Sequence, residues 1–145
     1  MTKQIKNIIC NTQGELYEWA ALRGYKFPEF SDIYLKSDFC KHSMDTIYSR
    51  FQIREPEEHI DFLFSEHPEL ESCKSIDGII YDSEVAYWIG YTYRHMHFIS
   101  GIQSTELCKL LPFIQMEQWY PGLHTVDEDE AADIIMNFVK RNTNR

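Results

Sequence analysis

The stretch YDSEVAYWIGYTYRHMHFISGI, residues 81–102, is the longest apolar and aromatic segment of the chain. It carries helix signals at both ends, because Asp82 or Ser83 can cap a first turn and Gly101 follows the last apolar residues. Between these signals, apolar side chains recur at the spacing of a helix face: Val85, Trp88, Ile89, Thr92, Met96 and Ile99. The stretch predicts a helix over residues 82–100. Since aromatic and basic side chains line its other faces, we expect this helix to be central.

The rest of the chain carries helix signals as well. Apolar spacing, caps and breaks at glycine or proline predict further helices over residues 15–22, 28–41, 46–53, 57–66, 104–111, 113–120 and 125–141. Residues 3–10 fit a helix or an edge strand, and a helix is favoured. Gly14 is expected to separate the first two. Residues 67–77 are predicted to form the longest loop, and residues 142–145 a frayed tail.

Strand signals are missing from the sequence, which has neither an alternating apolar pattern nor an Asn-Gly hairpin turn. The prediction is therefore an all-α fold, a single compact domain of six to eight helices around the central helix. A chain of 145 residues with 43% hydrophobic content is long enough to bury one core. We expect one helical domain over residues 1–145.

Charge and cysteine spacing limit the possible partners. The net charge of −9 and the scattered basic residues argue against direct nucleic-acid binding and favour a partner protein with a basic surface. The four cysteines stand singly, about thirty residues apart, so no zinc-finger spacing occurs. Residues 1–10 do not resemble a signal peptide, and no long uncharged apolar segment occurs. We expect a cytoplasmic protein that does not enter a membrane.

The run Arg94-His95-Met96-His97 is the most suggestive chemical motif. Two histidines separated by one residue point about 200° apart on a helix, so they do not easily share a metal. An enzyme or ligand site built from Arg94, His95, His97, Tyr91 and His124 remains an alternative. The acidic run 127–130 suits a solvated first helical turn, and the six glycines are isolated from one another. We expect no catalytic residue, metal or cofactor.

A second aromatic cluster occupies residues 118–125, QWYPGLHT. Loops with large side chains often display binding residues. The same residues could also fold back and plug the core against the central helix. The two interpretations are compatible with each other.

The segments YDSEVAYWIGYTYRHMHF, WYPGLHTVDEDEA and FSDIYLKSDFCKHSMDTIYSRF resemble a family of small uncharacterised bacterial proteins. The resemblance spans about residues 30–138. Members tend to be encoded beside proteins that look like ADP-ribosyltransferase toxins, which implies a toxin–antitoxin accessory or antitoxin role. The family more often has an aromatic pair at His95-Met96 and a proline at Glu128, and neither departure removes an established catalytic residue.

The leading prediction is a non-enzymatic protein-binding module, antitoxin-like or a regulator of a partner enzyme. Its candidate contacts are Tyr91, Arg94, His95, Trp119, Tyr120 and His124. One alternative is a phage-borne acidic inhibitor of a bacterial defence nuclease of the CRISPR type. Others are an enzyme or ligand-binding protein with a pocket near Arg94, His95 and His97, and a subunit that only oligomerises through its aromatic surface.

Overall fold

The central helix forms as its local signals predict. In the computed structural model, which describes residues 1–143, helix α5 spans Ser83–Ser100. Asp82 caps it, because its carboxylate accepts hydrogen bonds from the backbone N–H groups of Glu84 and Val85. Gly101 ends it with a left-handed φ of 75°, a conformation that glycine adopts without steric cost.

Most faces of α5 are covered, as expected for a central helix. Ile89, Thr92 and Met96 of the predicted apolar face are buried. Ile99, at the end of that face, is 46% exposed, so this part of the prediction is wrong. Arg94, on a different face, is fully buried.

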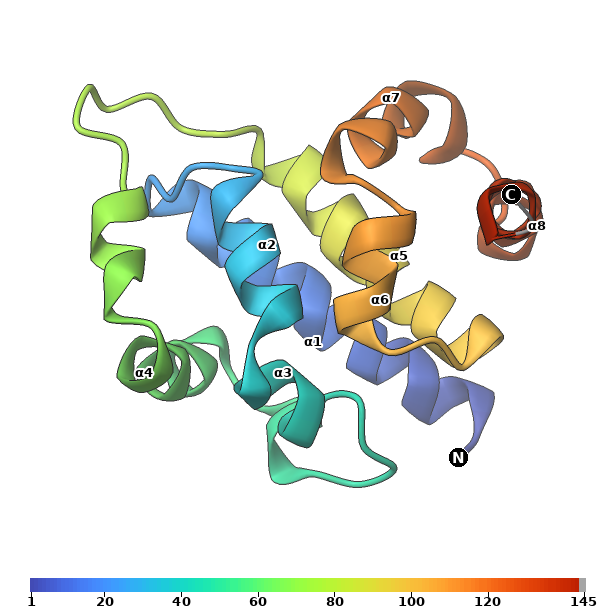
Figure 1. Cartoon of the computed structure of the whole chain (residues 1–145), viewed down its shortest axis with the longest axis horizontal. Helices are drawn as coiled ribbons and strands as arrows, with labels where there is room; N and C mark the ends of the chain where they lie inside the picture. The colour runs from blue at the N-terminus through green and yellow to red at the C-terminus, as the bar shows by residue number, and fades with distance from the viewer. Residues whose placement is uncertain (144–145) are drawn as a thin grey trace.

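Helix α1, Lys3–Leu22, is one continuous helix of 20 residues that packs antiparallel along α5 (Figure 1). The predicted break at Gly14 is therefore wrong. A Cβ atom at Gly14 would lie 2.8 Å from the ring of Tyr87, so the glycine allows a close approach between the helices instead of ending one. Gly90 on α5 has the same role, since a Cβ there would lie 2.6 Å from Tyr17 Cγ.

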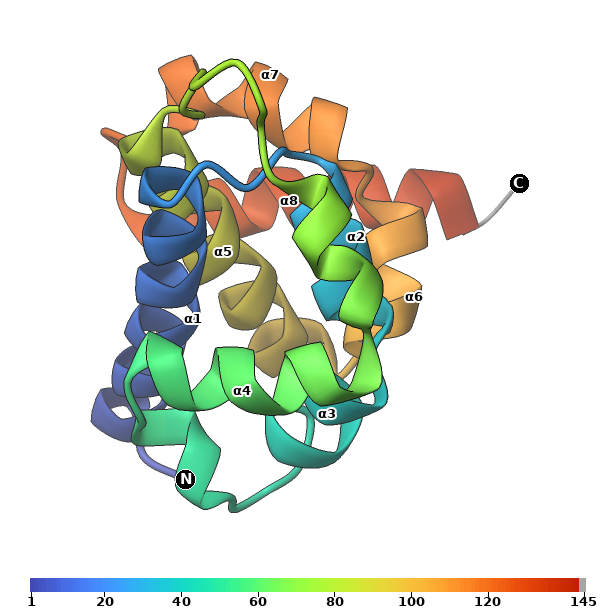
Figure 2. The ribbon, with the colours of Figure 1, turned by 90° about the vertical axis from the view of Figure 1, so that its left-hand side faces the viewer.

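The remaining elements surround this pair. They are α2 (Glu29–Lys36), α3 (Asp38–Ser43), the 3-10 helix η1 (Arg50–Ile53), α4 (Pro56–Glu66), the 3-10 helix η2 (Pro68–Cys73), α6 (Ser104–Leu110), α7 (Phe113–Leu123) and α8 (Glu128–Thr143). Helices α4 and α8 lie on opposite sides of the α1–α5 pair, as the two views in Figures 1 and 2 agree. The all-α prediction is confirmed, with eight α-helices and two 3-10 helices over residues 1–143.

Several predicted boundaries in the first half of the chain are wrong. The helix predicted over residues 28–41 is two helices, because Ser37 is extended and caps α3 through a hydrogen bond from Cys40 N–H to its hydroxyl. Residues 46–53 are helical only from Arg50. The predicted loop 67–77 contains η2.

The C-terminal boundaries also differ from the prediction. Helix α7 continues through Pro121 for two more residues, where the missing proline N–H affects only the last turn. The helix predicted over residues 125–141 begins at Glu128, and Asp127 caps it by accepting a hydrogen bond from Asp129 N–H. Of the predicted frayed tail, residues 142 and 143 belong to α8, and residues 144–145 lie outside the described part.

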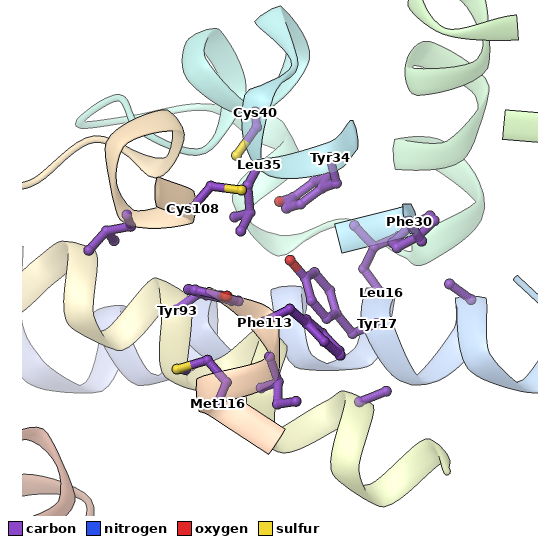
Figure 3. Packing of buried hydrophobic residues seen from close by; sticks show 14 of the residues in the cluster. Leu16, Tyr17, Phe30, Tyr34, Leu35, Cys40, Tyr93, Cys108, Phe113 and Met116 are labelled. Carbon is purple, nitrogen blue, oxygen red and sulfur yellow. The ribbon is translucent and has the colours of Figure 1, made fainter. Parts of the chain in front are cut away.

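Aromatic side chains fill the core where α1, α2, α5 and α7 meet (Figure 3). Tyr17 of α1 lies at the centre and contacts the edges of Phe30 and Tyr34 of α2. Tyr93 of α5 and Phe113 of α7 close the other side. Two of these buried tyrosines have paired hydroxyls, since Tyr93 donates to the Leu111 carbonyl at 2.6 Å and Tyr17 is 2.7 Å from the Ser31 hydroxyl.

Buried residues from nearly every helix join this one cluster, so residues 1–143 form a single domain. Within the same residues, none of the helices combines the length and the apolar character needed to cross a bilayer.

Candidate functional site

A cleft of about 220 Å³ opens between α5, the end of α7 and the start of α8. Helix α5 contributes an aromatic wall, formed by Tyr87, Trp88 and Tyr91. His124 lies at the α7 edge and Glu128 at the α8 edge. The cleft thus combines ring faces with one carboxylate, in a chain whose net charge is −9.

The aromatic wall is held in place by contacts between α5 and α8. The Tyr91 hydroxyl donates a hydrogen bond of 2.8 Å to Glu128 Oε2. Its ring lies 6.1 Å from the Tyr87 ring and 6.3 Å from that of His95. Burial, together with the Glu128 carboxylate, raises the pKa of Tyr91, so this hydroxyl stays a donor. Tyr91 and His95 therefore both line the cleft.

The second aromatic cluster divides between cleft and core. Tyr120 stacks on His124, with ring centroids 4.2 Å apart, and meets Trp88 edge-on at 5.9 Å, which places it beside the cleft. Trp119 packs instead against Phe138 of α8, with 5.1 Å between the ring centroids. The expected loop is instead helical up to Leu123, where α7 ends. Trp119 packs towards the core, and a binding role for the other side chains stays a prediction.

Arg94 does not belong to this surface, because its side chain is completely buried. Its Nη1 atom lies 2.6 Å from Asp45 Oδ1, in an ion pair closed off from solvent. Nε and Nη2 both donate to Gln13 Oε1, at 3.0 and 2.8 Å, and Nη2 also donates to the Ser104 hydroxyl. Arg94 is therefore a structural residue that links α1, α5, α6 and the segment after α3, and its assignment as a surface contact is corrected.

The network around Arg94 also shifts the pKa values of Asp45 and His97. Burial acts to raise the pKa of Asp45, but Arg94 and two hydrogen bonds from Ser104 hold that pKa below its usual value. His97 lies nearby, with Nδ1 donating to the Ile102 carbonyl at 2.7 Å, and burial together with Arg94 lowers its pKa. A neutral His97 thus suits its place beside the ion pair.

His95 and His97 lie in different environments, as their spacing on the helix requires. His95 faces α8, where Nε2 is 3.9 Å from Asp129 Oδ1, and His97 lies 3.8 Å from Asp45 Oδ1. The pocket expected near Arg94, His95 and His97 together is therefore not formed by these side chains.

The four cysteines are all buried, and burial raises the pKa of each thiol, to about 12 for Cys10 and Cys108. A thiol with a raised pKa is a poor nucleophile at neutral pH, because the thiolate is the reactive form. These groups therefore do not supply nucleophilic chemistry to the cleft.

The sequence-based candidates include Tyr91 of the aromatic wall but not Tyr87 or Trp88, although the sequence carries a signal for part of this wall. Tyr87, Tyr91 and His95 are spaced by four residues, so they form one row along α5. The sequence places Glu128 only in a solvated acidic turn, and nothing local pairs it with Tyr91, 37 positions away.

No protein-family model, curated protein or solved structure matches the chain. The resemblance to toxin-associated bacterial proteins therefore stays a prediction.

Proposed function

We propose that this chain is a non-enzymatic, antitoxin-like module that binds a partner protein by holding one of its basic side chains in the α5–α7–α8 cleft. The observation that carries the proposal is the aromatic wall of Tyr87, Trp88 and Tyr91 facing the Glu128 carboxylate. Aromatic faces attract the cationic head of arginine or lysine, and a nearby carboxylate adds a charge-assisted hydrogen bond.

The size of the cleft supports a side chain as its occupant. Its volume of about 220 Å³ is below the roughly 300–1,000 Å³ of a typical small-molecule pocket. The alkyl stem of a lysine or arginine can lie along the rings, while its charged head reaches Glu128.

Negative charge outside the cleft also favours a basic partner. The first turn of α8 carries Glu128, Asp129 and Glu130, directly after Asp127. Together with the net charge of −9, this turn attracts a basic partner surface over a distance of about 8–10 Å at physiological salt. In the antitoxin-like role, that surface belongs to the toxin enzyme which the chain neutralises.

The test is co-expression with the product of the adjacent gene, scoring growth and co-purification together. The informative variant is Glu128→Gln, which keeps the size of the side chain and its bond from Tyr91 but removes the charge. We expect the affinity to fall roughly tenfold, about 1.4 kcal/mol. Glu130→Gln is the matched control, because Glu130 is exposed on the same turn and does not line the cleft.

Failure to rescue growth or to form a complex would refute the antitoxin-like role. A complex that binds Glu128→Gln and Glu130→Gln equally well would instead show that the cleft is not the contact site.

The acidic run 127–130 also favours a second candidate, an inhibitor that occupies the basic groove of a defence nuclease. Such an interface depends mainly on long-range charge, so its affinity falls steeply with salt. An aromatic cleft contact keeps more of its affinity, because its rings exclude water. Measuring the dissociation constant against a basic nuclease from low to high salt separates the two candidates.

A further inference from the structure

Three potential metal ligands meet at one end of the cleft, from two different helices. His95 comes from α5, and Glu128 and Asp129 come from the first turn of α8. One ligand atom from each residue lies within 4.8 Å of the other two, and His95 Nε2 is 3.9 Å from Asp129 Oδ1. Ligand atoms at about 2.0–2.2 Å from a zinc ion lie roughly 3–4 Å from one another. Small side-chain rotations would therefore bring these three ligand atoms to coordination distance from one ion.

The imidazole of His95 provides a second observation that points to a ligand. Its Nε2 atom is shut off from solvent and has no hydrogen-bond partner among residues 1–143, although the side chain as a whole is 13% exposed. An unpaired buried nitrogen costs about 1–3 kcal/mol, so native proteins seldom leave one without a partner. A metal ion between His95 and the two carboxylates would pair it.

The surroundings of the cluster also fit a metal site. The Tyr91 hydroxyl donates to Glu128 Oε2 at 2.8 Å, which fixes that carboxylate and leaves its second oxygen free to bind. Two carboxylates balance the two charges of a divalent ion and offset the positive end of the α8 dipole. The exposed Lys3 ammonium is 3.8 Å from Asp129 Oδ2 and would move aside into solvent.

We infer that His95, Glu128 and Asp129 form a binding site for a divalent transition-metal ion, which clips the first turn of α8 to α5. One imidazole and two carboxylates suit Zn²⁺, and three protein ligands leave a coordination position open towards the cleft. Metal binding at this site does not require the proposed partner, although the two share Glu128. Where both occupy the cleft, the ion and a basic side chain compete for Glu128.

The experiment is titration of the isolated, tag-free chain with ZnCl₂ by calorimetry, repeated with Co²⁺ to read the absorption spectrum. We expect one ion per chain and a d–d spectrum without a sulfur charge-transfer band. His95→Ala and Asp129→Asn should each weaken binding at least tenfold. Asp129 is 64% exposed, so its substitution tests the site even if the largely buried His95 proves necessary for folding.

His67→Ala is the matched control, because His67 also lies between two carboxylates, Glu66 at 2.9 Å and Glu69 at 2.7 Å. Both of its ring nitrogens are already paired, so this variant should bind zinc as the wild type does. The inference is overturned if both site variants keep wild-type affinity, if His67→Ala loses it, or if the Co²⁺ spectrum reveals thiolate ligands. Absence of any binding by the wild-type chain overturns it as well.

Discussion

Arg94 carries its positive charge in the interior, at the point where four segments of the chain meet. Asp45 supplies the countercharge, and the other guanidinium hydrogen bonds go to Gln13, Ser104, the Met44 carbonyl and the Cys40 sulfur. Gln13 is itself fixed, because it donates to the Gly90 carbonyl and accepts from Tyr34. A buried pair of this kind adds little over apolar packing, but losing one partner leaves a charge without compensation.

Replacing Asp45 should therefore be severely destabilising. We expect Asp45→Asn to lower the free energy of unfolding by about 3–5 kcal/mol, measured by urea denaturation. Asp133→Asn is the control, since Asp133 is exposed on α8, and its change should stay within about 0.5 kcal/mol. A loss below about 1 kcal/mol at Asp45 would contradict a structural role for the ion pair.

The Arg94–Asp45 ion pair also predicts how the stability lost in Asp45→Asn depends on pH. The pKa of Asp45 is lower in the folded chain than its ordinary value of 3.8. Its contribution is therefore complete above the unfolded-state pKa and disappears as the pH falls through the folded-state pKa. The stability gap between wild type and Asp45→Asn should be constant between about pH 7 and pH 5 and narrow only below about 3.8. A gap that had already closed at pH 5 would show that Asp45 is not held ionised.

At the scale of elements, the closest packing is between α1 and α5, and glycine makes it possible. A Cβ atom at Gly90 would lie 2.6 Å from Tyr17 Cγ and 2.8 Å from the Gln13 carbonyl oxygen. A backbone oxygen cannot rotate away, so the helices would have to separate. Tyr17 and Gln13 belong to the core and to the Arg94 network, respectively, so both would be disturbed.

Gly90→Ala should consequently destabilise the fold by about 1–3 kcal/mol, despite the better helix propensity of alanine. Gly122→Ala provides the comparison, because Gly122 is also helical and a Cβ there meets nothing within 4 Å. That variant should be unchanged or up to about 1 kcal/mol more stable. Thermal unfolding of the two alanine variants measures the difference, and equal stabilities would refute close packing at Gly90.

At the scale of the whole molecule, the buried thiols report on how the domain opens. Cys10, Cys40, Cys73 and Cys108 lie in α1, α3, η2 and α6, so together they sample most of the core. Each is buried and has a raised pKa, and each therefore becomes reactive only when its surroundings open.

We expect a disulfide reagent such as Ellman's to label the native chain at least about 100-fold more slowly than the chain in guanidinium. All four thiols should react at once after denaturation. The Asp45→Asn variant should be labelled faster than wild type in native buffer, because its open states are more populated. Rapid labelling of any native thiol would identify a locally exposed cysteine and contradict the packing described here.

Local signals in the sequence were enough to predict several helices. Asp82 and Gly101 predict both ends of α5, because a cap and a left-handed glycine act on backbone groups within a few residues. Gly14 shows where this reasoning fails, since the same residue type can end a helix or allow a second one to approach. Only Tyr87, far along the chain, distinguishes the two roles.

The sequence by itself determined the all-α class and the central helix, because helix periodicity and capping depend on neighbours in the chain. Only the tertiary structure decided which side chains meet. It buries Arg94 against Asp45, 49 positions away, and brings His95 to Glu128 and Asp129 on another helix. These pairings depend on how the helices pack, and packing is a property of the whole core that no local pattern encodes.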